Sequence, residues 1–326
     1  PSVVVKAAAI AIERYPNIQL VLVGKEKRLE PYLKKNKIHD HPNITIHHAT
    51  EVVAMDEKPS IALRTKKDSS MRVAVNLVKE GVVEACVSAG NTGALMATSK
   101  FVLKTLPGID RPAIVYALPA RAPNSDVISK IHMLDLGANI ECSADHLFQF
   151  AVLGSVLCQS TEGKKNPRVA LLNIGEEEIK GLENIKEAAK RLSECKKINY
   201  IGFVEGNDIF NTKADVIVCD GFTGNVALKT IEGVAKFLGG ILKREFSKNL
   251  LTRLSSIGVM PILMNIKDQM DLKNFNGASF LGLKGIVIKS HGSADAEGFA
   301  TAIGEAVREV EHNVPKQTAS KLEDIL

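Results

Sequence analysis

Residues Val216–Asn225 read VIVCDGFTGN: an apolar run, a polar loop with two glycines, and the start of a helical pattern. A run that is apolar throughout is typical of a β-strand covered on both faces. A strand that leads through a helix to another strand implies a βαβ crossover and therefore parallel pairing. This unit decides the fold class because it recurs along the chain.

The same alternation extends over most of the 326 residues. Strands are expected at Gln19–Val23, Ile44–His48, Val82–Val87, Ala113–Leu118, His132–Leu136, Val169–Ile174, Tyr200–Val204, Val216–Cys219 and Ile286–Ile288. Helices are expected at Val3–Ile12, Ser70–Lys79, Thr92–Lys104, Ala144–Gln159, Asn184–Cys195 and Ala296–Glu311. The pattern predicts an α/β protein with a mostly parallel sheet and helices on both faces.

The amino-acid composition argues against several classes of protein. Apolar residues make up 45% of the chain and charged residues 24%, which argues against disorder. The net charge of +5 comes without a Lys/Arg stripe interleaved with aromatics, so no nucleic-acid partner is expected. It mildly favours an acidic protein partner or an anionic membrane surface. No apolar stretch reaches the roughly 18 residues that span a bilayer.

The five cysteines include no CxxC motif, which predicts a reducing cytoplasm. Cys86 and Cys219 lie in apolar runs and are expected to be buried thiols. His39, His41, His47 and His48 lack the spacing of a zinc site, so no metal is expected. The sequence also has neither a GxGxxG fingerprint with a downstream acid nor a P-loop, and no nucleotide cofactor is expected.

Six expected strands run into small, polar, glycine-containing loops. They are Ser88–Gly93, Asp135–Asn139, Asn173–Glu177, Glu205–Asp208, Asp220–Asn225 and Ser290–Ser293. In open α/β sheets, ligands bind beyond the carboxyl ends of the strands, where exposed N–H groups at helix starts attract anions. A single glycine loop can serve turn geometry alone, but six of them predict an active site at one edge of the sheet.

Several of these loops carry a family resemblance. VSAGNTGALMATSKFVLKTLPGIDRPAI (Val87–Ile114) resembles the signature of the PlsX phosphate acyltransferases. Further matches are MDEKPSIALRTKKDSSM (Met55–Met71), MLDLGANIECSADHLFQFAVLGSVL (Met133–Leu157), PRVALLNIGEEEIKG (Pro167–Gly181), FVEGNDIFNTKADVIVCDGFTGNVALKT (Phe203–Thr230) and IVIKSHGSADA (Ile286–Ala296). The match extends from about residue 1 to about residue 312.

The resemblance implies a fold similar to the isocitrate/isopropylmalate dehydrogenases and phosphotransacetylases, a homodimer, and peripheral contact with the membrane. The implied reaction is reversible transfer of a fatty acyl group from acyl carrier protein to inorganic phosphate. The acyl phosphate would serve a membrane glycerol-3-phosphate acyltransferase in phospholipid synthesis. No cofactor is implied.

This reaction needs no catalytic triad. Phosphate is largely dianionic near neutrality, and a thiol with a pKa of about 8.5 leaves with little acid help. The protein has to gather the anion, orient it against the carbonyl and stabilise the oxyanion. Phosphate binding is assigned to residues at two helix starts, namely Asn91, Thr92 and Gly93, and Thr223, Gly224 and Asn225. Three further candidates for substrate binding are Asn139, Glu176 and Asp220.

The catalytic candidates are Lys180, Asn225 and His291. Lys180 could neutralise phosphate or polarise the carbonyl, and His291 could protonate the leaving thiolate or hold the oxyanion. Structural alternatives stay open: Asn91 and Asn225 could only cap helices, Lys180 could be a solvated loop residue, and His291 could be structural.

A protruding helical element is expected at about residues 239–270. Its apolar residues recur every three or four positions, namely Leu238, Ile241, Leu242, Phe246, Leu250, Leu254 and Ile257. They are flanked by the basic residues Lys243, Arg244, Lys248 and Arg253. The apolar run Val259–Met264 follows and contains Pro261. Such a stripe fits a core or dimer helix, or an interfacial membrane element with a basic face.

The expected organisation is one acyltransferase domain over residues 1–314 and a loose tail over residues 315–326. Family members open with a strand and a DAMGGD-type glycine loop, whereas this chain begins at what resembles the proline after that loop, Pro1. Two other functions remain open. One is a phosphate acetyl- or butyryltransferase that uses coenzyme A, and the other is a non-catalytic, membrane-associated scaffold of lipid synthesis. A decarboxylating dehydrogenase is disfavoured because no arginine cluster with metal-binding aspartates is present.

Overall fold

The computed structural model describes residues 1–121, 123, 127–249, 258–263 and 275–325. The helices are α1 (Ser2–Arg14), α2 (Glu26–Lys35), α3 (Pro59–Thr65), α4 (Ser70–Lys79), α5 (Thr92–Leu103), α6 (Ala144–Glu162), α7 (Glu183–Glu194), α8 (Gly221–Phe246), α10 (Ala296–Glu311) and α11 (Val314–Ile325). A short 3-10 helix covers Gly206–Asp208. Residues 258–263 are also helical.

The strands are β1 (Leu20–Gly24), β2 (Ile44–His48), β3 (Ala85–Ser88), β4 (Ala113–Arg121), β5 (Ile128–Leu134), β6 (Arg168–Leu172), β7 (Asn199–Val204), β8 (Val216–Val218), β9 (Ala278–Leu281) and β10 (Ile286–Lys289). They form a small β1–β2 sheet and an eight-stranded sheet in the order β3-β10-β9-β4-β5-β8-β6-β7. Most pairings are parallel, and those of β9 with β10, β9 with β4 and β4 with β5 are antiparallel. The predicted α/β class is confirmed.

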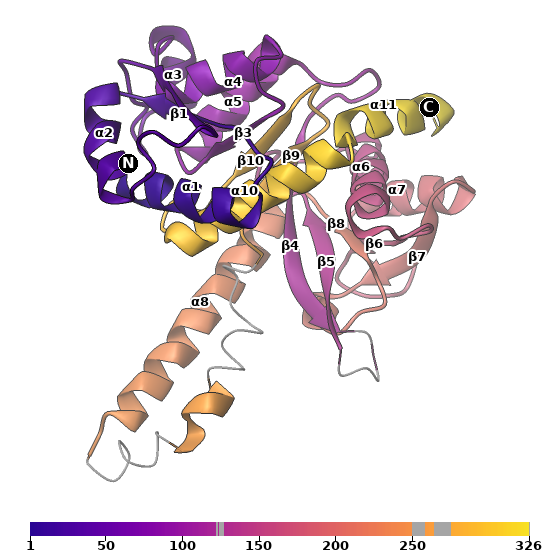
Figure 1. Cartoon of the computed structure of the whole chain (residues 1–326). Helices are drawn as coiled ribbons and strands as arrows, with labels where there is room; N and C mark the ends of the chain where they lie inside the picture. Colours follow the sequence, from indigo (N-terminus) through magenta and orange to yellow (C-terminus); the bar gives the residue numbers. More distant parts are fainter. Residues whose placement is uncertain (122, 124–126, 250–257, 264–274, 326) are drawn as a thin grey trace.

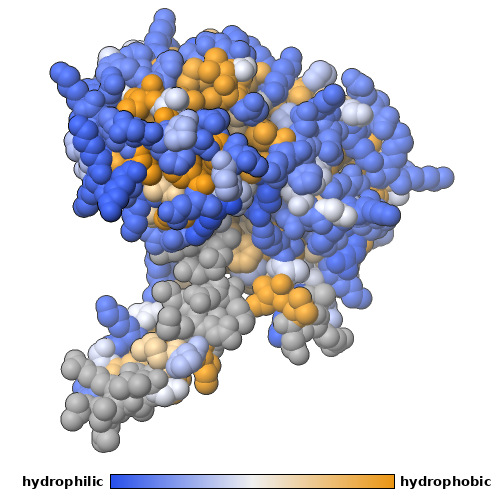
Figure 2. Space-filling view, in the orientation of Figure 1, coloured by the Kyte–Doolittle hydropathy of each residue, from blue (hydrophilic) through white to orange (hydrophobic). Residues whose placement is uncertain are grey.

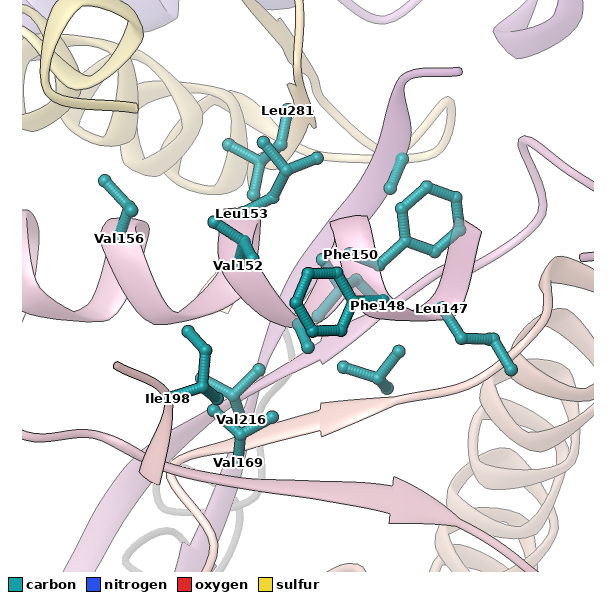
Figure 3. Close-up of a cluster of buried hydrophobic side chains, with 14 of the residues drawn as sticks. Leu147, Phe148, Phe150, Val152, Leu153, Val156, Val169, Ile198, Val216 and Leu281 are labelled. Carbon is teal, nitrogen blue, oxygen red and sulfur yellow. The ribbon is translucent and has the colours of Figure 1, made fainter. Parts of the chain in front are cut away.

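Helices cover both faces of the large sheet (Figure 1). In β6, Val169 and Leu171 face a core built on α6, whereas Ala170 and Leu172 face a second core that includes residues of α5. Figure 3 shows the first core, where Leu147, Phe150 and Val156 of α6 gather with residues of the strands. Burial on both faces explains why these strands are apolar throughout.

Helix starts are fixed by side chains that accept hydrogen bonds from otherwise unpaired backbone N–H groups. Ser69 accepts from Arg72 N at the start of α4, and Asp295 accepts from Gly298 N at the start of α10. Ser143 and His146 form a reciprocal capping box at the start of α6. Such caps stabilise a helix by about 1 kcal/mol and explain these boundaries.

The prediction of a loose tail over residues 315–326 is wrong. Val314–Ile325 form α11, which packs against α6. Val314, Thr318 and Leu322 are buried, and the Gln317 Oε1 atom accepts a hydrogen bond from Ser160 Oγ of α6 at 2.6 Å. Their spacing of four residues places one face of the helix in the core, whereas the polar residues between them made the segment resemble a tail.

The protruding element is confirmed in part. Helix α8 extends away from the body (Figure 1) and includes Leu238, Ile241, Leu242 and Phe246 of the predicted stripe. It begins at Gly221, earlier than the predicted start at about residue 239, because it directly continues the loop after β8. Leu250, Leu254 and Ile257 lie outside the described residues.

Strand direction also corrects the sequence analysis. The six glycine loops were expected at one edge of a parallel sheet, but β3 and β10 run opposite to β5, β6, β7 and β8. The sheet therefore consists of two half-sheets of opposite direction, joined by β9 and β4. Their loops leave from two different ends.

Strand β4 nevertheless brings the two sets of carboxyl ends to the same level. It pairs with β9 over Ala113–Val115, and Ser279, the partner of Val115, also pairs with Ile288 near the end of β10. On the other side β4 pairs with β5, where Tyr116 lies opposite Met133 near the end of that strand. The carboxyl ends of β10 and β5 therefore lie at the same level of the sheet, with β9 and β4 between them.

Candidate functional site

Three groups of loops at these strand ends carry the predicted site residues. The first contains Ser88–Gly93 and Ser290–Ser293, which are joined by the hydrogen bond from Ser290 N to Ser88 O at 2.9 Å. The second contains Asp135–Asn139 and Asp220–Asn225, joined by the bond from Gly221 N to Asn139 O at 2.7 Å. The third is Asn173–Gly181. Helix α8 starts in the second group and passes the first, where Glu232 Oε1 lies 3.7 Å from His291 Nε2.

Asn91 is a structural residue in the first group. Its Oδ1 atom accepts a hydrogen bond from Ala94 N and so caps α5. Its Nδ2 atom donates to the carbonyls of Ala54, Met55 and Glu57, which fixes the loop before α3. Because both ends of this buried amide are occupied, the capping alternative describes Asn91 better than phosphate binding.

Thr92 and Gly93 form the exposed first turn of α5. A Cβ atom on Gly93 would lie 2.9 Å from Pro59 Cγ, so this glycine permits the close packing of α3 on α5. The N–H groups of a first helical turn have no partner within the helix and favour anions. This turn stays a candidate for phosphate binding.

Asp135, which the sequence analysis did not select, organises the second group. Its carboxylate accepts hydrogen bonds from Ile114 N, Ala138 N, Asn139 N and Asn139 Nδ2 at 2.6–3.1 Å. Burial raises its pKa, although these bonds favour the ionised form. Asn139 is buried as well and also donates to Pro112 O, so it joins loops instead of facing a ligand.

The start of α8 is built by Asp220, Thr223 and Gly224. Asp220 caps the helix by accepting from Thr223 N at 2.9 Å and Thr223 Oγ1 at 2.7 Å. A Cβ atom on Gly224 would lie 2.0 Å from Asp135 O, so only glycine fits this approach. Both polar side chains therefore serve the helix start.

Asn225 differs from Asn91. It follows the first turn of α8, is exposed, and lies against Gly137. Within the described part of the chain its amide has no hydrogen-bond partner. The capping alternative fails for Asn225, because Asp220 is the cap.

The third group contains Lys180 and Glu176, both exposed. The loop folds back on Asn173, whose Nδ2 atom donates to Gly175 O and Lys180 O. Gly181 has a φ of +90°, and a Cβ atom there would lie 2.1 Å from Asn173 Oδ1. Among the described residues, neither the Lys180 ammonium nor the Glu176 carboxylate bonds to another candidate.

His291 is held in one tautomer. Its Nδ1 atom accepts a hydrogen bond from Ser293 N at 3.2 Å, so a neutral ring carries its proton on Nε2. Burial lowers the pKa of His291 below its ordinary value, an effect that Glu232 opposes and nearby lysines reinforce. The ring is therefore mainly neutral at pH 7 and presents an N–H donor. This favours the oxyanion role over proton donation.

Asn276 fixes the turn that carries His291. It is buried, accepts from His291 N at 3.0 Å, and donates to Ser290 Oγ at 2.8 Å and Gly298 O at 2.7 Å. Asn276, Glu232 and Lys289 were not among the predicted site residues. A sequence signal existed for Lys289, because it ends the otherwise apolar run of β10, which was expected to stop at Ile288.

A cavity borders the first group of loops. It has a volume of about 680 Å³ and is lined mainly by apolar residues of α1, β1, α4, β3 and α10, and it reaches Ser88–Gly90 at its end. Figure 2 shows hydrophobic side chains gathered over this N-terminal part of the molecule. No group of three or more metal-ligating side chains occurs among the described residues, and no described helix is long and apolar enough to cross a membrane.

Comparison with known proteins gives a consistent result. A family model described as "Fatty acid synthesis protein" matches residues 1–317. The phosphate acyltransferase of Francisella philomiragia is 57% identical, and that of Francisella tularensis subsp. novicida 56%, each over 99% of this chain and 94% of the relative.

Solved structures of low identity show the same fold. A phosphotransacetylase from Streptococcus pyogenes superposes with a TM-score of 0.65 at 17% identity, over 95% of this chain and 91% of its own. A 4-hydroxythreonine-4-phosphate dehydrogenase from Klebsiella pneumoniae gives 0.50 at 14% identity, over 94% of both chains. The expected likeness to phosphotransacetylases and dehydrogenases is confirmed at the level of the fold.

Proposed function

Since this chain belongs to the fatty acid synthesis protein family and is a phosphate acyltransferase, we propose that it transfers a fatty acyl group from acyl carrier protein to inorganic phosphate. The phosphate oxygen attacks the thioester carbonyl, the carbon–sulfur bond breaks, and acyl phosphate and a free thiol result. The observation that carries the proposal is the approach of α8, which starts in the second group of loops, to the first group, where Glu232 Oε1 lies 3.7 Å from His291 Nε2.

The roles follow from what each side chain has available. The Asn225 amide and the N–H groups of Thr92 and Gly93 in the first turn of α5 offer donors to the phosphate or the carbonyl oxygen. His291 offers its Nε2–H to the developing oxyanion. Lys180 supplies a positive charge on an exposed loop. The loops themselves are held in place by hydrogen bonds of Asn91, Asn139 and Asp220, which had been predicted to bind substrate.

The first experiment measures thiol release from long-chain acyl carrier protein with and without inorganic phosphate. Phosphate-dependent release with recovery of acyl phosphate supports the proposal, and release from acyl coenzyme A alone would instead favour the coenzyme A alternative. If no thiol is released from acyl carrier protein or from acyl coenzyme A, the acyl-transfer proposal is wrong for this chain and the scaffold alternative is favoured.

His291→Gln separates the two roles of the histidine, with the exposed His312→Gln as its matched control. If the neutral ring stabilises the oxyanion, the His291-dependent rate falls on the acid side of the ordinary histidine pKa of 6.5 and is flat above it. A rate that falls as the pH rises through neutrality would show that the protonated ring is needed and contradict the oxyanion role.

We also propose that the enzyme is a cytoplasmic homodimer that contacts an anionic membrane through the projecting part of α8. Phe237, Leu238 and Leu242 there are 68%, 49% and 47% exposed, and Lys243 and Arg244 lie beside them. Figure 2 shows hydrophobic residues along this projection. Membrane contact would deliver the acyl phosphate, a reactive mixed anhydride, to a membrane glycerol-3-phosphate acyltransferase. The five free cysteines fit a reducing compartment.

A further inference from the structure

Lys289 is a buried cation at the carboxyl end of β10. It is 8% exposed, directly precedes Ser290 and His291, and donates a hydrogen bond from Nζ to the Ser290 carbonyl. An ammonium group has three N–H donors, and within the described ranges this carbonyl is its one acceptor. Two donors are therefore left without a partner among the described residues.

The surroundings of Lys289 do not neutralise it. Burial, and then repulsion from Lys229 of α8, lower the pKa of Lys289 to about 8, and no carboxylate contributes in the opposite direction. Glu232, the acid beside His291, accepts from Lys229 Nζ at 2.8 Å and lies 3.7 Å from His291 Nε2. Lys236, one turn further along α8, adds a positive charge near His291. Three lysines and a histidine thus face one carboxylate.

A buried charge without a partner is costly, and proteins keep such groups where a ligand compensates the charge. We propose that Lys289 is the charge partner of the substrate phosphate, which binds as a dianion between the end of β10 and α8. Two Lys289 N–H groups would bind its oxygens, His291 Nε2–H stays available for the oxyanion, and Glu232 positions Lys229. The site rests on the proposed function, because that function supplies inorganic phosphate as the ligand.

The test compares Lys289→Met with Lys284→Met, an exposed lysine between β9 and β10. Thermal unfolding is measured over a series of inorganic phosphate concentrations. Phosphate should raise the Tm of the wild type and of Lys284→Met, because a ligand that binds only the native state stabilises it. Lys289→Met should start at an equal or higher Tm, since methionine removes the cost of burying the charge, and should lose the phosphate-dependent shift.

Kinetics give the second readout. In Lys289→Met the KM for phosphate should rise roughly 10- to 100-fold, as expected when a hydrogen bond to a charged group is lost, with a smaller change in the KM for the acyl donor. In the wild type the KM for phosphate should rise as the pH increases beyond about 8, where Lys289 loses its proton. This measurement needs no variant and therefore does not depend on whether Lys289→Met folds.

Two results would overturn the inference. One is a lowered Tm of Lys289→Met with the phosphate shift retained, which would make Lys289 structural. The other is a KM for phosphate that stays constant between pH 7.5 and 9.5. A phosphate-dependent Tm shift without any phosphate-dependent thiol release would leave this site standing and reject the proposed function instead.

Discussion

The absence of a side chain at Gly224 allows the start of α8 to approach the backbone of Asp135 closely. The Cβ atom of any other residue would lie 2.0 Å from Asp135 O and 2.9 Å from Cys219 Sγ. In the same helix, a Cβ atom on Gly233 would meet nothing within 4 Å. The two glycines therefore differ in cause: one is required by a close approach and the other is not.

Gly224→Ala should lower the free energy of unfolding by about 1–3 kcal/mol through overpacking, and should reduce activity by displacing Asn225. Gly233→Ala should raise it by about 0.5–1 kcal/mol, because alanine favours the helix. Urea denaturation of both variants measures the difference. Equal effects would mean that the start of α8 can move away from Asp135 at little cost.

Glu309 makes stability depend on pH. It is buried in α10, and burial and then repulsion from Glu305 raise its pKa from 4.5 to about 8, although Ser279 and Arg308 oppose the shift. The unfolded carboxyl releases its proton near pH 4.5, whereas the folded one keeps it until about pH 8. The stabilisation is therefore complete below pH 4.5 and is lost as the pH rises to about 8.

The contribution to the slope is at most about 1.4 kcal/mol per pH unit. Glu309→Gln keeps the size and polarity of the side chain and should remove this part of the pH dependence, whereas the exposed Glu311→Gln should not. Chemical denaturation at pH 5 and pH 8 makes the comparison. Identical profiles for the wild type and Glu309→Gln would show that Glu309 is ionised in the folded protein.

At the scale of elements, α11 behaves as part of the core. Leu322 is 2% exposed, and its neighbour Glu323 is exposed. Leu322→Ala should cost about 2–5 kcal/mol, as for other buried leucines, and Glu323→Ala less than about 0.5 kcal/mol. The Tm values of both variants decide the matter, and a neutral Leu322→Ala would restore the prediction of a loose tail.

Helix α8 carries the membrane proposal. Replacing Phe237 and Leu242 by Ser should reduce cosedimentation with anionic vesicles severalfold, because the loss of apolar area weakens interfacial binding. Val127→Ser, a 72% exposed residue next to β5, is the matched control. Since the projecting part of α8 contributes little to the core, the Tm should stay within a degree or two. Unchanged vesicle binding with an altered oligomeric mass would assign this surface to the dimer.

For the whole molecule, the sequence predicts where helices and strands lie better than it predicts the relative directions of the strands in the sheet. The strand runs and the boundaries of α4 and α10 are correct, because burial on both faces and side-chain caps leave local patterns. The segment between the strands expected at Ala113–Leu118 and His132–Leu136 resembled a crossover. Both strands extend into it and form the antiparallel β4–β5 pair, a tertiary outcome that no local pattern encodes. The short strand β9 was missed.

The sequence predicts which loops form the site, but it does not predict the role of each side chain in them. Asn91 and Asn225 both follow a strand and stand beside a glycine, yet one amide is occupied on both sides and the other has no described partner. Asn91 caps α5, whereas the cap of α8 is Asp220, five residues before Asn225. Lys289 and Glu232 matter only because two half-sheets meet, so their proximity has no signature in sequence.

The projection of α8 also affects how the molecule moves through solution. A helix of 26 residues is about 39 Å long, and much of it lies outside the body (Figure 1). A projecting rod adds friction but little mass, so a chain of 35.2 kDa shaped in this way sediments more slowly and elutes earlier from a sizing column than a sphere. An early elution volume is therefore no proof of a dimer, and the oligomeric state has to be measured by light scattering or equilibrium sedimentation.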